Sequence, residues 1–311
     1  MSDAAGALEH AFAGLVDAVA GVAPGWLALG VVLHLANQVA RGRGWYAVIR
    51  SAGAETRKRD AVAAWVAGAG AGGVVSARGG DAVRVLVLAR SSPGTGCALL
   101  TGTLVAEAVG ECALGAAVLA LALAIGVGPE VGPSATSALY VSAGVLALTA
   151  FVLLGRRSSR VRGFLSRAKQ GCVALKCPKS YARDVLPWQL ASRMLRLGAL
   201  ACFLAAFGLP ATPAAVLLVV FAQSSGRLVP FSPASVGAGA AILAATFEPV
   251  TGTAVPAAQV AAFFIGTSTV LTVVGTVLAL TICAQASAKV GPSFAVVGRL
   301  MRTRPATVPR P

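Results

Sequence analysis

The chain has 311 residues, of which 57% are hydrophobic and only 12% are charged. Soluble proteins carry about 25% charged residues, so this composition excludes a cytosolic enzyme, a secreted disulfide scaffold and a disordered chain. The formal net charge of +15 raises the question of nucleic acid. In a membrane protein, basic cytoplasmic loops that face anionic lipid explain such an excess, and we expect no nucleic-acid partner.

Apolar segments recur along the whole chain. They cover residues 25–40, 61–77, 95–126, 134–154, 185–208, 213–229, 233–247 and 257–284. Several reach the length of about 20 residues that an α-helix needs to span a bilayer. We therefore predict an all-α fold, a polytopic integral membrane helical bundle whose transmembrane domain covers 25–285.

Lysine and arginine are distributed very unevenly between these segments. Residues 1–24 contain none, whereas 41–60 contain six, 78–90 contain three and 155–184 contain nine. Basic loops of membrane proteins face the cytoplasm. This rule predicts a multi-pass protein of the cytoplasmic membrane with the N-terminal segment outside and the C-terminus inside. The full spans that it predicts are 25–40, 95–126, 134–154, 185–208 and 257–284.

The remaining apolar segments are short and are interrupted by glycine or proline. Segment 61–77 has basic residues at both ends, so it is predicted to enter from the cytoplasm and return without crossing. Segments 213–229 and 233–247 are predicted to dip in from outside, because prolines interrupt them and their outer flanks carry no positive charge. Broken elements that enter from opposite faces suggest an inverted repeat. The alternative is a hairpin over 213–247 that crosses fully, which gives seven spans.

Two basic segments are expected in the cytoplasm. In 155–184, apolar residues recur at helical spacing between positive charges, which predicts an amphipathic helix on the inner leaflet. A solvated loop is the alternative. The tail over 286–311 is basic and rich in proline, and it is predicted to be disordered.

Other residue types give weaker signals. The six cysteines form no C-x-x-C pair, and only two histidines could join them as ligands, so we predict no metal site, disulfide or cofactor. The tryptophans lie close to predicted membrane interfaces, where belt positions are typical. They are Trp26, Trp45, Trp65 and Trp188.

Glu107 and Glu111 are the strongest candidates for function, because ionisable groups inside a span are costly. Their spacing places both on one helix face, about 18–24 Å from the start of the segment. The candidate cationic partners are Arg193, Arg196 and Arg227. The pair predicts a relay for a proton or cation, or a contact with a polar lipid head group. The alternative is a structural ion pair between helices.

A second cluster contains Arg78, Asp81 and Arg84, which share a face if a helix begins near Gly79. Arginines beside the free N–H groups of a helix start would suit a phosphate. The alternative is a cytoplasmic loop whose basic side chains reach toward the head groups.

A third cluster lies at a predicted helix break between Pro230 and Pro233. Arg227 precedes the break, and Ser232 could cap the next helix. An arginine at this place is hard to explain by packing alone. The sequence contains no Ser-His-acid set, Walker loop or metal-binding helix, and we expect no enzymatic activity.

Together these residues resemble the lysylphosphatidylglycerol synthase transmembrane-region family, a flippase-like domain that also forms the membrane half of multiple-peptide-resistance proteins. The resemblance covers roughly 25–285. Asn37-x-x-x-Arg41 with Trp45 resembles the family's N-x-x-x-R…W signature. The stretch S-A-R-G-G-D-A-V-R over 76–84 is similar to its P-x-R-x-G-E-x-x-R element, with serine for proline and aspartate for glutamate.

Two further motifs carry the resemblance, each with departures. E-A-V-G-E over 107–111 resembles E-R-x-x-D, with Ala108 in place of arginine and Glu111 in place of aspartate. V-P-F-S-P-A-S-V-G over 229–237 resembles P-x-S-P-G-G-x-G-x-x-E, but Ala240 stands where the acid would be. A soluble aminoacyltransferase domain is not found, so lipid aminoacylation by this chain alone is not expected.

The resemblance implies a lipid translocator. Its lipid would be an anionic phospholipid or a polyprenyl-phosphate-type lipid. The phosphate would meet Arg78, Arg84 and Arg227, while the two glutamates balance that charge or bind a cationic head group or a proton. The alternative is a membrane accessory protein without transport, which partners an envelope glycosyltransferase or lipid-modifying enzyme through 155–184. A homo-oligomer is a further option.

Overall fold

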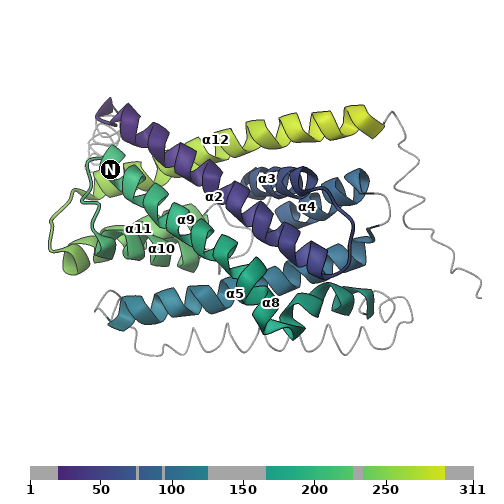
Figure 1. The fold of residues 1–311 in the computed structure, drawn as a ribbon. Helices are drawn as coiled ribbons and strands as arrows, with labels where there is room; N and C mark the ends of the chain where they lie inside the picture. Colours follow the sequence, from purple (N-terminus) through teal and green to yellow (C-terminus); the bar gives the residue numbers. More distant parts are fainter. Residues whose placement is uncertain (1–19, 75–76, 93–94, 125–165, 227–233, 291–311) are drawn as a thin grey trace, which may run out of the picture.

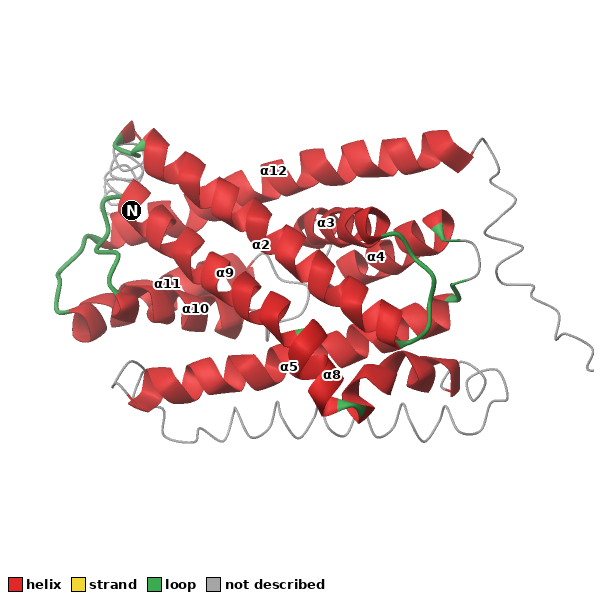
Figure 2. Cartoon of the chain, in the orientation of Figure 1, coloured by secondary structure: helices red, strands yellow, loops and turns green. Residues whose placement is uncertain are grey.

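The computed structural model describes residues 20–74, 77–92, 95–124, 166–226 and 234–290 (Figure 1). Within these ranges the chain is helical and contains no strand, so the all-α class is confirmed (Figure 2). The elements are α2 (Pro24–Ser51), α3 (Lys58–Val74), α4 (Ala77–Ser91), α5 (Cys97–Ala124), the 3-10 helix η1 (Cys172–Lys176), α8 (Pro178–Asp184), α9 (Leu186–Ala206), α10 (Pro213–Gly226), α11 (Ala234–Thr251) and α12 (Ala257–Val290).

Helices α2 and α9 pack closely along each other in the middle of the bundle (Figure 1). Both begin with a proline in the first turn, where its fixed φ angle suits a helix start. The Ala23 N–H donates to the Ala206 carbonyl at 2.8 Å, so the start of α2 is fixed to the end of α9. The two helices are therefore antiparallel, and residues in the middle of one face the middle of the other.

Two helical hairpins flank this central pair. Helices α3 and α4 pack together, and a hydrogen bond of 3.4 Å from Thr56 to Ser92 links the start of α3 with the end of α4. Gly68 and Gly80 allow this approach, because a Cβ atom on Gly80 would meet the Gly68 carbonyl. Helices α10 and α11 form the second hairpin, and α12 contacts both α3 and α11.

The buried residues form two main clusters. The larger one joins α9, α10, α11 and α12, and its largest side chains are Phe203, Phe207, Phe247, Phe263 and Phe264. The second joins α2, α3, α4 and the start of α5 around Trp45 and Trp65. These two rings are in contact, with centroids 5.8 Å apart. The second cluster supports the polar residues described below.

The predicted loops over 41–60 and 78–90 are wrong in large part. Helix α2 continues through Arg41, Arg43 and Arg50 to Ser51, and most of 78–90 forms α4, which begins at Ala77, two residues before Gly79. Positive charges mark where an apolar run ends, but the helix that contains the run can continue beyond that point. As a result, basic residues assigned to loops lie on helices that pack in the bundle.

The interface positions predicted for two tryptophans are also wrong. Trp45 and Trp65 are fully buried, and both donate hydrogen bonds inside the bundle. Trp26 is 50% exposed, as a belt residue would be. An indole ring carries both a large apolar surface and one N–H group, so it also suits a buried position that offers an acceptor.

Among the described residues, two helices contain stretches that are long and apolar enough to cross a bilayer, Cys97–Gly115 and Ala257–Gln285. They coincide with the predicted spans over 95–126 and 257–284. Shorter apolar stretches occur at Pro213–Gln223 and Gly239–Thr251. The number of spans and the inverted repeat stay predictions. The predicted span over 134–154, most of 1–24 and most of the tail lie outside the described residues.

The basic segment is described from residue 166. It forms consecutive short helical pieces, 166–171, η1 and α8, rather than one continuous amphipathic helix. It packs against α5 through small residues: the Cys172 thiol donates to the Gly102 carbonyl at 3.4 Å, and Gly171 lies against Leu99. Its basic side chains on the opposite side are exposed. They are Arg167, Lys169, Lys176, Lys179 and Arg183.

Candidate functional site

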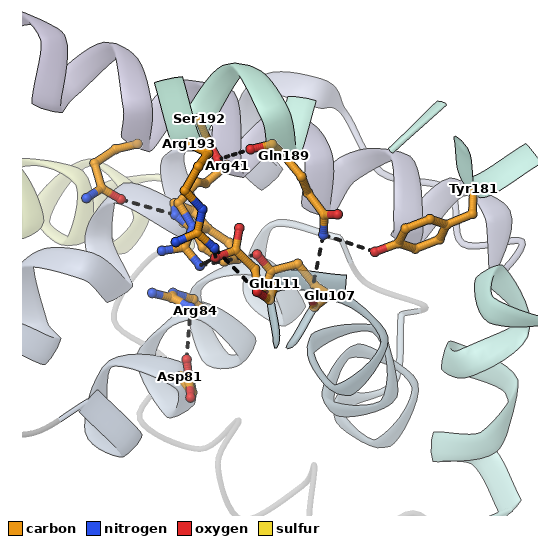
Figure 3. Close-up of polar contacts among 11 residues, drawn as sticks. Arg41, Asp81, Arg84, Glu107, Glu111, Tyr181, Gln189, Ser192 and Arg193 are labelled. Atoms are coloured by element: carbon orange, nitrogen blue, oxygen red, sulfur yellow. Dashed lines mark hydrogen bonds and ion pairs between the residues drawn. The ribbon is translucent and has the colours of Figure 1, made fainter. Parts of the chain in front are cut away.

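A network of ion pairs joins α2, α5 and α9 inside the bundle (Figure 3). Arg41 of α2 lies between Glu107 and Glu111 of α5. Its Nη2 atom is 3.4 Å from Glu107 Oε1 and 3.3 Å from Glu111 Oε2. The i, i+4 spacing on α5 brings both carboxylates to the same guanidinium, as expected for one helix face.

Arg193 of α9 completes this network. Its Nη2 atom is 3.6 Å from Glu111 Oε2 and also donates to the Glu111 backbone carbonyl at 3.3 Å. The side chain of Glu107 is 7% exposed, and that of Glu111 is 19% exposed. Burial of charge is costly unless the charge is paired, and here each glutamate has an arginine partner.

Trp65 of α3 connects this network to α4. The Cζ atom of Arg41 lies 4.9 Å from the Trp65 ring centroid, and that of Arg84 lies 3.8 Å from it. Both distances allow a cation–π contact. The Trp65 N–H is held by Gln38 Oε1 at 3.2 Å, so the ring is fixed in place. Arg84 is close enough to Arg41 and Glu107 to interact with both electrostatically.

Each of the two arginines on Trp65 keeps one N–H donor that no group in the described part of the chain accepts. The Nε atoms of Arg41 and Arg84 are buried and have no hydrogen-bond partner among the described residues. Arg84 also pairs with Asp81 at 2.9 Å, but Asp81 is 53% exposed and lies on the outer side of α4. Buried donors are nearly always satisfied in folded proteins, so two such N–H groups beside one ring point to a missing acceptor.

A polar contact leads from this cluster to the basic segment over 166–184. Gln189 of α9 donates to the Glu107 backbone carbonyl at 3.4 Å and to the Tyr181 hydroxyl at 3.0 Å (Figure 3). Burial raises the pKa of the Tyr181 phenol above its usual range, so this hydroxyl keeps its proton at neutral pH. Gly110 leaves room for these groups, because a Cβ atom there would meet the Tyr181 hydroxyl.

The predicted site residues are brought together only in part. Glu107, Glu111 and Arg84 belong to one cluster, and Arg193, one of the predicted cationic partners, pairs with Glu111. Arg196 donates to Gln223 of α10 at 2.9 Å. Arg227 and Ser232 lie outside the described residues, and so does the side chain of Arg78. No group of three metal-ligating side chains occurs in the described ranges.

Sequence reasoning assigned no site role to Arg41 and Trp65, although both are central to the cluster. Arg41 follows the apolar run over 25–40, so the charge pattern predicts a loop at this position. A signal for it exists: His34, Gln38 and Arg41 repeat at helical spacing, which marks a polar face on α2. Nothing in the sequence around Trp65 distinguishes its buried position from an interface position.

Comparison with known proteins agrees with this arrangement of polar residues in an apolar bundle. The profile of a family described as "Lysylphosphatidylglycerol synthase TM region" matches residues 7–279, which is most of the chain. No curated protein and no solved structure matches. Membership indicates a transmembrane protein with a lipid-related function. The chain therefore belongs to the lysylphosphatidylglycerol synthase transmembrane-region family.

Proposed function

We propose that this protein binds the phosphate of a polar lipid at Arg41 and Arg84 and translocates that lipid across the cytoplasmic membrane. The observation that carries the proposal is the pair of buried guanidinium groups on Trp65, each with an Nε–H that has no partner in the described residues. Guanidinium groups donate strong, charge-assisted hydrogen bonds to phosphate oxygens. An anionic phospholipid or a polyprenyl-phosphate-type lipid offers such oxygens.

The exposure of these residues supports a site that a head group can reach. The Arg41 side chain is 25% exposed and the Arg84 side chain is 16% exposed, so neither is sealed in the core. Large apolar side chains on α5 and α12 are exposed around the bundle, which suits contact with acyl chains. In this proposal the N-terminus lies outside and the C-terminus lies in the cytoplasm, and the chain is not itself an enzyme.

Substitution of Arg84 tests this proposal. We expect Arg84→Gln to reduce translocation at least tenfold, because loss of one charge-assisted hydrogen bond to phosphate removes about 1.5–3 kcal/mol. The measurement is the inward or outward movement of a labelled phosphatidylglycerol in vesicles that contain the purified protein. The carboxylate of Asp81 is exposed and stays hydrated when Arg84 is removed, so the substitution should not unfold the protein.

The matched control is Arg90→Gln, which removes an exposed arginine from the same helix. It should move lipid at the wild-type rate. Equal rates for wild type, Arg84→Gln and protein-free vesicles would contradict translocation by this protein.

One observation favours a second candidate function. The segment over 166–184 is fixed to α5 on its apolar side and exposes five basic side chains on the other. A membrane enzyme with an acidic cytoplasmic face could bind there, in which case the protein would act as an accessory subunit. Affinity purification from native membranes distinguishes the two functions: an accessory subunit retains an enzyme in fixed ratio and loses it when Arg167, Lys169, Lys176 and Lys179 are changed to glutamine.

A further inference from the structure

Charge balance around Glu107 and Glu111 limits what can bind beside them. Their contacts link two arginines with two glutamates, and Arg84 is already paired with Asp81. Positive and negative charges are therefore equal within the ion-paired groups. A phosphodiester that binds to the free Nε donors adds one negative charge to this balanced set.

We propose that the Glu107–Glu111 pair takes up one proton when an anionic head group binds at Arg41 and Arg84, and releases it when the head group leaves. This inference rests on the proposed function and names the proton as the ion whose movement is coupled to that of the lipid. The lipid anion and the proton would cross together, so each cycle would move no net charge. The proton is taken from water on the loading side and returned to water on the other.

The physical reason is the cost of uncompensated charge away from water. A third anion near two carboxylates raises the energy of the ionised pair, and neutralising one carboxylate removes that cost. Both carboxylates lie within 3.4 Å of the same Arg41 Nη2 atom, so they share one donor. A protonated carboxyl still accepts from that donor through its other oxygen, and its O–H can donate to the neighbouring carboxylate or to the phosphate.

Every element that packs against α5 contributes its groups to this balance. Arg41 faces the pair from α2, Arg84 from α4 and Arg193 from α9. Arg196 lies one turn farther along α9, and its contact to Gln223 directs it toward α10. From the basic segment over 166–184, Tyr181 and the Cys172 thiol face α5, and burial raises the pKa of both, so neither supplies a charge.

The test uses vesicles that contain the purified full-length protein and a labelled phosphatidylglycerol, with the pH varied equally on both sides. At pH values where the glutamate pair of the lipid-bound protein keeps its proton, we expect a constant wild-type translocation rate. At higher pH, we expect this rate to fall about tenfold per pH unit, which is the slope for one proton. Glu107→Gln and Glu111→Gln fix the pair in the charge state of its protonated form. The translocation rate of each variant should therefore change less than about twofold across the same pH range.

Glu55→Gln is the matched control, because Glu55 is exposed and outside the cluster. It should keep the wild-type slope. A second measurement does not depend on the variants: wild-type protein in weakly buffered detergent should take up about one proton for each phosphatidylglycerol that it binds. In sealed vesicles, an acidic loading side should accelerate transport, whereas a membrane potential alone should not.

The outcomes separate this inference from the function beneath it. A wild-type rate that is independent of pH, in vesicles where Arg84→Gln still abolishes transport, would overturn proton coupling and leave translocation intact. A steep fall of the translocation rate with pH that persists in both glutamine variants would also overturn proton coupling and leave translocation intact. Absence of transport by wild type at every pH would overturn the proposed function, and the inference with it.

Discussion

Arg41→Met should destabilise the protein by about 3–5 kcal/mol, because it leaves the buried carboxylate of Glu107 and the partly buried carboxylate of Glu111 to one remaining arginine. Glu107 would lose its ion-pair partner, since Arg193 contacts only Glu111. Methionine keeps much of the arginine's apolar volume, so the loss reports mainly on charge. The measurement is the free energy of unfolding in mixed detergent, followed by the far-UV circular dichroism of the helices.

A second substitution distinguishes charge from packing at this position. Arg41→Met with Glu107→Gln removes one charge of each sign and should recover about 1–3 kcal/mol of the loss. Arg50→Met is the control, since Arg50 is exposed near the end of the same helix and should change stability by less than about 0.5 kcal/mol. If the double variant is as unstable as Arg41→Met alone, the ion pairs are not the source of the effect.

Trp65→Ala should cost about 3–5 kcal/mol, the range for removal of a large buried aromatic side chain. Trp65 is fully buried, packs against Trp45 and carries Arg41 and Arg84 on its ring. Its loss would therefore disturb both the cluster of α2, α3 and α4 and the position of the two guanidinium groups. Thermal unfolding in detergent measures the first effect, and lipid translocation measures the second.

Two other substitutions sharpen this prediction. Trp65→Phe keeps most of the ring but leaves Gln38 Oε1 without the indole N–H, so it should cost about 1 kcal/mol. Trp26→Ala removes a half-exposed indole from α2 and should change stability little in detergent. A loss for Trp65→Ala no larger than that for Trp26→Ala would show that Trp65 does not support the site.

The sequence predicts the all-α class and most residues of the central cluster for physical reasons that can be named. Glu107 and Glu111 stand out because carboxylates in an apolar run are costly, and their spacing fixes them to one face. The same reasoning offers Arg193 as a partner, since it lies early in another apolar segment. These inferences need only local information, namely composition, period and the cost of buried charge.

Arg41 and Trp65 could not be placed by the same reasoning. The apolar pattern of α2 ends near residue 40, but the helix continues to Ser51, and Gly42 allows its close contact with α3. That contact depends on segments far apart in the sequence. Likewise, whether an indole lies at a membrane interface or under two arginines is decided by its neighbours in space and not by its position along the chain.

We propose above that the guanidinium groups on Trp65 hold the phosphate of a lipid. Native mass spectrometry of the purified protein, with phosphatidylglycerol added in detergent, tests it most directly. We predict that wild type and Arg90→Gln retain one tightly bound phosphatidylglycerol and that Arg84→Gln loses it, with at least a tenfold difference in affinity for one lost charge-assisted hydrogen bond. Equal retention of the lipid by Arg84→Gln and wild type would show that Arg84 does not hold the phosphate.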